Sequence, residues 1–494
     1  MSLALLCLTL VAASTDVIAQ QRDDRFVDYA AEAETLVARA DAIGDADLAA
    51  EIAATLLPVD ADPLARRPRD VRQRTADQTD GRHHIERRFL EVRGEYAAVL
   101  YRLARRAVTA GHPAIAFGLL RESCHVDSDY APTRRLLGDV RVGDEWMTPH
   151  EATMQRARKV WHDRFGWIDE QHVPRYEAGE RFFRGKWMTA EEEAAIRRNS
   201  RYAWEIETGH FIVHSNHSIE RAALLAGRLE DYHRFFRRTY TTLFDAPKLT
   251  AALLESGNIA RRDKHQIRDF ASRGEYVTRL TPKMPGVEIS DGIYLKNDRT
   301  AYFFFQENQK RPTDVLYHEV SHQLLYESDA RDRPTAADAH FWVIEGFASY
   351  LESFDPGGTL AIDAEQPMIG DPNHLRMYRA REQLLEKGLF EPFASLDSYG
   401  QRRFQQGETV EEIRRRYVQA TGLTHFFLHA KDGRYRDAFL THLRDLYDAR
   451  VRTARSLTEL TGLPAGEIDR QYKAYLRTLD ADATYPILSE RRPD

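Results

Sequence analysis

Cysteine is almost absent from this chain, which has two cysteines in 494 residues. This scarcity excludes a disulfide framework, and it also excludes a metal site built from several thiolates. Cys7 lies in an apolar N-terminal run, so removal of that run would leave Cys124 alone. Stability must therefore come from the packing of a hydrophobic core, for which a chain of this length has ample material.

An excess of charge of one sign is also missing. The formal net charge is −7, from 70 basic and 77 acidic residues, which gives no electrostatic basis for a nucleic-acid partner. Lysine is scarce, because only 10 of the 70 basic residues are Lys and the other 60 are Arg. We attribute this bias to genome composition. With 43% hydrophobic and 30% charged residues, the composition is typical of a soluble globular protein of two or three domains.

Long apolar runs are absent as well, apart from residues 3–13, which are far fewer than the ~20 residues needed to span a bilayer. This run, followed by small residues before Gln20, predicts a secretory signal peptide over residues 1–19, although no Lys or Arg precedes it. The mature protein would then be secreted or periplasmic, without a membrane span. A short hydrophobic helix at the start of a cytoplasmic protein is the alternative.

Helical patterns fill residues 20–135. They cover residues 26–57, with a break near Gly44, residues 85–110 and residues 114–124, and a polar linker rich in Pro, Asp and Arg lies near 58–82. The string A-G-H-P-A-I-A-F-G-L-L, followed by D-Y-A-P-T-R-R-L-L-G, resembles a helix-turn-helix repeat of the tetratricopeptide kind. One or two such units are too few for a solenoid. A plain helical domain and a groove for a protein partner both stay open.

Residues 136–200 contain a short repeat with a tryptophan. The segment Gly143-Asp-Glu-Trp-Met-Thr recurs as Gly185-Lys-Trp-Met-Thr, and a weaker copy, Gly166-Trp-Ile, lies between them. Each copy predicts a turn and a strand, followed by a helix that Thr148 or Thr189 caps. The regular spacing favours tryptophans that anchor a core over tryptophans that stack on a ligand.

From residue 201 onward, strand patterns precede a motif that carries chemistry. The predicted strands are residues 204–207, 210–214, 249–255, 292–295 and 300–305, of which the last two form a hairpin. A long helix is predicted over residues 218–243, and the chain after residue 352 is mostly helical. The predicted fold class is α+β, mostly helical.

The motif H-E-x-x-H lies within residues 313–328, where apolar spacing predicts a helix with Thr313 as its N-cap. His318 and His322 then lie one turn apart on one face, which suits Zn²⁺ with nitrogen ligands at ~2.0–2.1 Å. Glu319 lies about 100° round the helix, beside the metal, where it suits a general base for water. The alternative is a buried helix whose histidines are only hydrogen-bonded.

A third ligand decides between these alternatives. Residues 341–352 read F-W-V-I-E-G-F-A-S-Y-L-E and predict a second helix after a short polar turn. If this helix packs back on the first, Glu345 reaches both histidines, and Gly346 lets the two helices approach closely. Three protein ligands and one open position are typical of a catalytic site that holds one zinc ion.

The pair H-E-V-S-H-Q and W-V-I-E-G-F-A-S-Y-L-E resembles the zinc site of the gluzincin metallopeptidases, and its second half is similar to a segment of aminopeptidase N-like enzymes. Residues 201–494 more broadly resemble the peptidase MA-like families of exported bacterial proteins. The resemblance implies a thermolysin-like catalytic domain in which His318, His322 and Glu345 bind zinc and Glu319 is the catalytic base. It also makes Tyr417 the candidate that donates a hydrogen bond to the oxyanion. A tyrosine in a core helix is the alternative, and His425 is a weaker candidate.

Two departures from the gluzincin pattern affect the interpretation. The glycine-methionine-glutamate motif that holds a free N-terminus in aminopeptidases is absent, which favours an endopeptidase. Ser349 stands where some gluzincins have an aspartate that orients a histidine, so Glu352 or a backbone carbonyl would take that part. We therefore expect an exported zinc peptidase acting on peptides or proteins. A non-catalytic zinc-containing scaffold that binds partners through its helical and Trp repeats is the alternative, and hydrolysis of another bond is a third reading.

Overall fold

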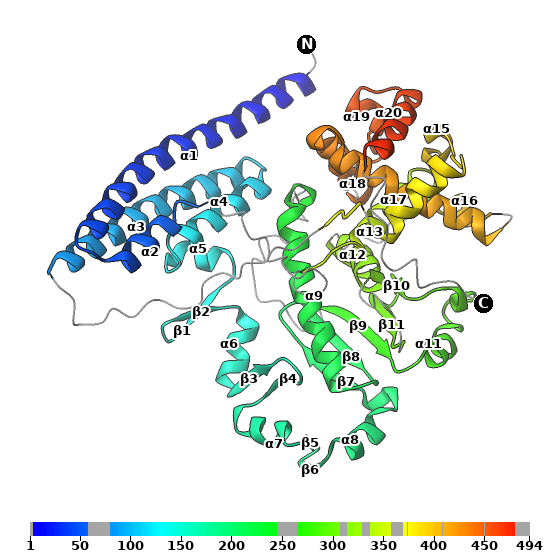
Figure 1. The fold of residues 1–494 in the computed structure, drawn as a ribbon, viewed down its shortest axis with the longest axis horizontal. Helices are drawn as coiled ribbons and strands as arrows, with labels where there is room; N and C mark the ends of the chain where they lie inside the picture. The colour runs from blue at the N-terminus through cyan, green and yellow to red at the C-terminus, as the bar shows by residue number, and fades with distance from the viewer. Residues whose placement is uncertain are drawn as a thin grey trace. The chain divides into compact units, whose positions relative to one another are not determined.

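The computed structural model describes residues 3–57, 80–244, 264–306, 314–328, 336–356, 369–372, 374–407, 409–448 and 450–479. Helices predominate, and a small mixed sheet accompanies them (Figure 1), which confirms the predicted α+β, mostly helical class. The chain divides into two compact units, residues 1–160 with 234–263 and residues 161–233 with 264–494. One boundary therefore falls inside the Trp repeats.

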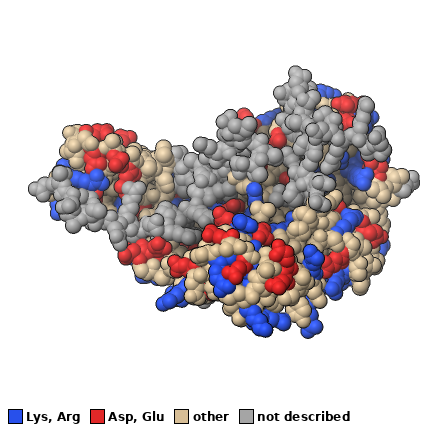
Figure 2. All heavy atoms as spheres, turned by 60° about the horizontal axis from the view of Figure 1, so that its bottom comes forward, with Lys and Arg blue, Asp and Glu red and all other residues tan. Residues whose placement is uncertain are grey.

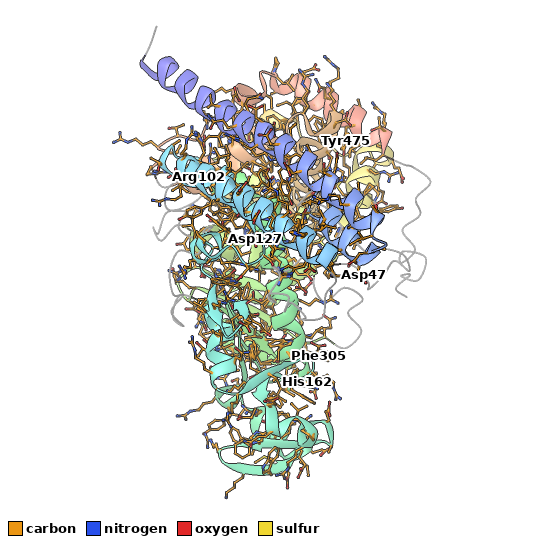
Figure 3. The ribbon with its side chains drawn as sticks, turned by 90° about the vertical axis from the view of Figure 1, so that its left-hand side faces the viewer. Asp47, Arg102, Asp127, His162, Phe305 and Tyr475 are labelled. Carbon is orange, nitrogen blue, oxygen red and sulfur yellow. The ribbon has the colours of Figure 1, made fainter. Side chains whose placement is uncertain are left out.

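Long helices build the N-terminal part of the first unit. They are α1 (Leu3–Ala42), α2 (Ala46–Ala54), α3 (Asp80–Thr109), α4 (Pro113–Val126) and the short α5 (Ala131–Leu136). Helix α3 packs on both α1 and α4, and Figure 3 labels Arg102 on α3 and Asp127 at the end of α4. Alanines at the contacts, among them Ala33, Ala97 and Ala104, are completely buried, so the helices approach closely.

The break predicted at Gly44 is confirmed, because the Asp45 side chain accepts a hydrogen bond from the Leu48 amide and caps α2. The predicted signal-peptide boundary falls within α1, where the Ile18 side chain is buried. Most of the predicted linker lies outside the described residues. No helix in the part of the chain that the structure describes is long and apolar enough to cross a membrane.

The Trp repeats form successive units of a hairpin and a helix. These are β1 (Val140–Val142), β2 (Glu145–Met147) and α6 (Pro149–Arg156); β3 (Lys159–His162), β4 (Gly166–Asp169) and α7 (Val173–Glu177); and β5 (Glu180–Phe183), β6 (Lys186–Thr189) and α8 (Ala190–Arg197). Thr148 and Thr189 cap α6 and α8 through capping boxes, as predicted. Trp146 is buried and donates to Asp129 at 2.6 Å, which fits an anchor. Trp187 is half-buried.

A mixed sheet with the strand order β10-β11-β9-β8-β7 lies in the second unit. The strands are β7 (Trp204–Glu207), β8 (Phe211–Ser215), β9 (His265–Phe270), β10 (Ile293–Leu295) and β11 (Thr300–Phe304). Strand β9 runs parallel to β8 and β11, whereas β10 and β7 pair antiparallel at the two edges. The predicted strands at both edges are confirmed, β9 was not predicted, and the strand predicted at 249–255 lies outside the described residues.

Further helices surround the sheet and the predicted metal site. They are α9 (Ile219–Thr239), α11 (Arg273–Leu280), α12 (Asp314–Ser328), α13 (Phe341–Leu351), α14 (Leu375–Arg381), α15 (Phe393–Asp397), α16 (Gln401–Gln405), α17 (Val410–Gly433), α18 (Arg436–Tyr447), α19 (Leu457–Thr461) and α20 (Ala465–Thr478). Helix α12 packs on β10, β11 and α13, and α13 packs on α17. Every residue of α13 is buried.

The predicted role of Gly346 in the contact of α12 with α13 is wrong. A Cβ atom at Gly346 would lie 2.6 Å from the Ala420 carbonyl oxygen and 2.6 Å from Thr424 Oγ1, both on α17. The missing side chain therefore lets α17, not α12, approach α13. The physical reason is that successive residues of a helix lie about 100° apart, so Gly346 lies on a different face of α13 from Glu345.

Candidate metal centre

Helix α12 carries both histidines of the H-E-x-x-H motif. Leu316, Val320 and Leu324 are buried and fix the helix in the core. His318 and His322 share a face one turn apart, and their Nε2 atoms lie 3.2 Å from each other. Sequence periodicity is thus enough to bring two imidazole nitrogens to one point.

Glu345 reaches both histidines from α13. Its Oε2 atom lies 3.3 Å from His318 Nε2 and 3.6 Å from His322 Nε2. Ligand atoms ~2.0–2.2 Å from a tetrahedral zinc ion lie ~3.3–3.6 Å from one another. The separations of the three atoms therefore match three corners of such a tetrahedron, and these residues could hold a metal ion.

Glu352 orients His318. The imidazole Nδ1–H donates to Glu352 Oε1 at 2.8 Å, which leaves the lone pair of Nε2 for a metal ion. Arg376 on α14 donates twice to the same carboxylate, at 2.6 and 2.7 Å. Burial opposes ionisation of Glu352, but the charge of Arg376 and the hydrogen bond of His318 lower its pKa to about 2. The sequence pointed to Glu352 or a carbonyl, but it gave no signal for Arg376.

The charges around His318 favour a cation. Burial disfavours a charged imidazole, yet hydrogen bonds to Glu345 and Glu352 outweigh burial and raise the pKa of His318 to about 10. Burial likewise opposes ionisation of Glu345, but His322 and His318 hold its pKa well below the usual range. The buried carboxylates of Glu345 and Glu352 are therefore stabilised by positive charge next to them, and a divalent metal ion bound by His318 would supply it.

Glu319 lies beside the ligand group and not within it. Its Oε2 atom accepts a hydrogen bond from the Tyr294 amide at 2.7 Å, and Tyr294 belongs to the edge strand β10. The Tyr294 hydroxyl donates to Glu327 Oε1 at 3.0 Å, two turns further along α12. Tyr294 thus binds α12 through both its backbone amide and its hydroxyl, and these two hydrogen bonds hold β10 along α12 and Glu319 in its position.

Tyr417 projects from α17, the helix against which Gly346 packs. Its ring contacts Phe404 edge-on, and its hydroxyl accepts a hydrogen bond from Gln405 at 3.3 Å. Burial raises the pKa of the phenol, and the negative charges of Glu345 and Glu319 raise it further, so the phenol keeps its proton. Tyr417 is near enough to both carboxylates to respond to their charge.

His425 lies two turns beyond Tyr417 and has another role. Its Nε2–H donates to the Gly370 carbonyl at 2.9 Å, and its Nδ1 accepts from the Tyr475 hydroxyl at 2.7 Å. Through these two hydrogen bonds His425 connects α17 with α20 and with Gly370, and neither of its nitrogens is left without a partner. This arrangement does not favour His425 as a donor to an oxyanion.

Two other groups of histidines and carboxylates occur among the described residues. His210, Glu230 and His233 form one, and His340, Asp397 and His442 form the other, and in each the ligand-type atoms lie within 4.8 Å of one another. Sequence reasoning missed both groups, because neither follows a known metal-binding motif. Only Glu230 and His233, on α9, are close in the chain, and the other members come together by tertiary packing.

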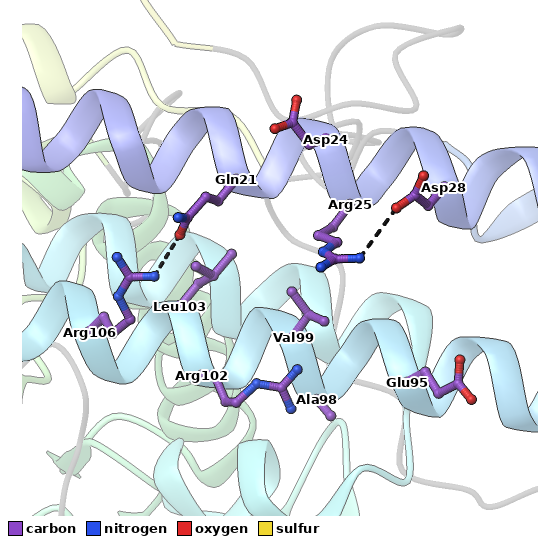
Figure 4. Close-up of a pocket in the computed structure, with 10 residues that line it drawn as sticks. All are labelled: Gln21, Asp24, Arg25, Asp28, Glu95, Ala98, Val99, Arg102, Leu103 and Arg106. Carbon is purple, nitrogen blue, oxygen red and sulfur yellow. Dashed lines mark hydrogen bonds and ion pairs between the residues drawn. The ribbon is translucent and has the colours of Figure 1, made fainter.

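A cavity of 870 Å³ lies in the first unit, between α1 and α3 (Figure 4). Its lining carries charges of both signs, and two of its arginines interact with other residues of the lining. Arg106 donates to Gln21 at 2.6 Å, and Arg25 pairs with Asp28 at 3.5 Å. The visible face in Figure 2 likewise shows acidic and basic side chains interspersed. No histidine is among the residues that line the cavity, and these residues belong to the other unit from His318, His322 and Glu345.

Comparison with known proteins adds no family to these observations. No family model, no curated protein and no solved structure matches this chain.

Proposed function

We propose that this protein is a zinc-dependent peptidase whose site is formed by His318, His322, Glu345 and Glu319. The observation that carries the proposal is the convergence of two Nε2 atoms and one carboxylate oxygen at separations of 3.2, 3.3 and 3.6 Å. Glu319 supports catalysis over mere metal storage, because it is a carboxylate placed next to the ligands but outside their set.

A bound Zn²⁺ supplies Lewis-acid chemistry, since it lowers the pKa of water toward ~7 and polarises a carbonyl oxygen. Glu319 accepts the proton of the attacking water and later delivers it to the leaving amine. The Tyr294 amide, by donating to Oε2 of Glu319, leaves Oε1 for that transfer. Tyr417 keeps its proton and donates it in a hydrogen bond to the negative charge that develops on the carbonyl oxygen.

A peptide is the substrate that the surroundings favour. Strand β10 is an antiparallel edge strand, and such an edge can bind an extended peptide by backbone hydrogen bonds. The edge lies next to Glu319, so a peptide aligned on it would bring a scissile bond to the base. We further propose that residues 201–494 form a gluzincin-like, peptidase MA-like domain, and that residues 1–19 export it to the periplasm or the medium.

Chelation and reconstitution test this proposal. The full chain is incubated with a proteome-derived peptide library, and internal cleavage products are identified by mass spectrometry. We expect cleavage that a chelator abolishes and that stoichiometric Zn²⁺ restores. Cleavage that persists after complete metal removal would contradict the proposal. Stoichiometric zinc without cleavage of any peptide would favour the non-catalytic scaffold.

A further inference from the structure

We propose a second metal site, made by His340, Asp397 and His442, for a divalent transition metal such as Zn²⁺. One ligand-type atom from each residue lies within 4.8 Å of the other two. His340 directly precedes α13, Asp397 ends α15, and His442 lies on α18. None of these residues belongs to the group around His318, so the inference does not rest on the proposed peptidase activity.

His442 is the strongest reason for the proposal. It is completely buried, and its Nδ1–H donates to the Arg455 carbonyl at 2.5 Å. Its Nε2 has no hydrogen-bond partner among the described residues. A buried nitrogen without a hydrogen-bond partner destabilises the fold, and a bound ion is one of the few explanations for it. Imidazoles that bind metals typically donate their other N–H to a carbonyl or a carboxylate, as His442 does.

His340 and Asp397 supply the other two ligand atoms. His340 Nδ1 and Asp397 Oδ1 lie 2.8 Å apart, and the rings of His340 and His442 are perpendicular with centroids 4.8 Å apart. A metal ion would replace the proton between Nδ1 and Oδ1 and widen their separation by about half an ångström. The Trp342 indole N–H, which donates to the same Oδ1 at 2.8 Å, would hold the carboxylate during this exchange.

The backbone around His340 is built to hold this side chain. His340 has φ 63°, a left-handed conformation that is uncommon for a residue with a side chain. Its amide donates to the Asp397 carbonyl at 2.9 Å, and the Phe341 amide donates to the Tyr399 carbonyl at 3.0 Å. The His340 side chain is 22% exposed, which gives an ion a route from solvent.

The burial of His442 also suits a neutral ligand. Because its Nδ1 carries the proton that is donated to the Arg455 carbonyl, the neutral ring has its lone pair on Nε2. Two imidazoles and one carboxylate favour Zn²⁺, Co²⁺ or Ni²⁺ over Mg²⁺ or Ca²⁺, which prefer oxygen. A metal ion here would join the start of α13, the helix that carries Glu345, to α15 and α18. We assign it a structural role.

Metal content of three chains tests the second site. Wild type, His442→Asn and His322→Asn are saturated with Zn²⁺, freed of unbound metal by gel filtration and analysed by mass spectrometry. Asparagine places an amide nitrogen near the position of Nδ1, so His442→Asn keeps a donor for the Arg455 carbonyl and removes Nε2. We expect two zinc ions per chain in wild type and one in each variant.

The outcomes separate this inference from the proposed function. One ion in wild type that His442→Asn loses and His322→Asn keeps would support the second site and contradict the catalytic zinc. One ion that His322→Asn loses and His442→Asn keeps would overturn the second site. If His442→Asn does not fold, Asp397→Asn replaces it, because asparagine still accepts from Trp342 but lacks the charge of a metal ligand. An Asp397→Asn chain with two tightly bound ions would also overturn the inference.

Discussion

Two groups in this protein each contain two histidines and one glutamate, the group of His318, His322 and Glu345 and the group of His210, Glu230 and His233, and they differ in how their side chains face one another. In the first, His318, His322 and Glu345 turn two Nε2 atoms and a carboxylate oxygen toward one point. In the second, Glu230 accepts from both the amide and Nδ1 of His210, at 2.8 and 2.7 Å.

The imidazole rings of the group around His210 are also arranged differently from those of the group around His318. His210 and His233 stack at a centroid distance of 3.8 Å, whereas His318 and His322 meet nearly at right angles. Stacked rings direct their nitrogens side by side, but perpendicular rings can direct nitrogens at a common ion. The comparison teaches that residue types alone do not make a metal site, since the orientation of the rings determines whether their nitrogens can point to one ion.

The largest expected effect comes from removing a ligand of the first group. His322→Asn should lose the catalytic zinc and all peptide hydrolysis, because two protein ligands hold zinc poorly. The matched change His210→Asn removes a histidine from the group of His210, Glu230 and His233, and it should retain both the catalytic zinc and peptide hydrolysis. Metal analysis and peptide hydrolysis on folded protein measure the difference. Equal loss of zinc in the two variants would remove the distinction between the groups.

A smaller effect is expected from the carboxylate behind the first group. Glu352→Gln removes the charge that orients His318, and the affinity for zinc should fall by roughly 10–100-fold. Competition with a chromogenic chelator measures this affinity. Glu170→Gln, a change of an exposed glutamate, serves as the control and should leave the affinity unchanged. An unchanged affinity in Glu352→Gln would show that the hydrogen bond to His318 Nδ1 does not tune the site.

The contact of α13 with α17 should be sensitive to one methyl group. In Gly346→Ala the added Cβ would lie 2.6 Å from the Ala420 oxygen, and we expect a loss of about 1–3 kcal/mol in the free energy of unfolding. Gly227→Ala, in helix α9, meets nothing within 4 Å and should stabilise by about 0.4–1 kcal/mol. Urea unfolding measures both. Destabilisation by Gly227→Ala as large as by Gly346→Ala would contradict this packing.

The smallest effect is expected in the pH dependence of stability, through Glu230 in the group of His210, Glu230 and His233. Burial opposes ionisation of Glu230, but His210 lowers its pKa from 4.5 to about 2. Between these values the unfolded chain binds the proton and the folded chain does not, so this contribution to stability is present above pH ~4.5 and is lost toward pH ~2. Glu230→Gln should therefore flatten the acid limb of the stability profile. An identical acid limb in wild type and variant would show that Glu230 does not contribute.

Local patterns in the sequence predicted the elements nearest the site. Helix α12, helix α13 and the β10–β11 hairpin lie within about two residues of their predicted bounds, because apolar periodicity decides such elements. Strand β9 was not predicted, since its sequence H-Q-I-R-D-F is polar. Its Asp269 is buried, and two hydrogen bonds from Arg221 at 2.7 Å and one from the Ser215 hydroxyl at 2.8 Å satisfy its carboxylate.

The parts of the site that depend on distant residues could not be predicted. Glu352 was a candidate because it lies at the end of the predicted helix that carries Glu345, but the Arg376 that holds it comes from α14. Gly346 was assigned to the wrong neighbour, because the sequence does not say which helix packs on which face. The group around His340 likewise arises from tertiary packing and carries no local spacing, and in the group around His210 only Glu230 and His233 are local, on α9.

Glu319→Gln tests the central claim most directly, because it removes basicity and keeps the size of the side chain. Glutamine still accepts from the Tyr294 amide, and Glu319 is not among the metal ligands. We predict zinc content and thermal stability equal to wild type, with peptide hydrolysis lower by ~10²–10⁴-fold, as expected for the loss of a general base. Hydrolysis at the wild-type rate in a zinc-loaded Glu319→Gln chain would contradict the account.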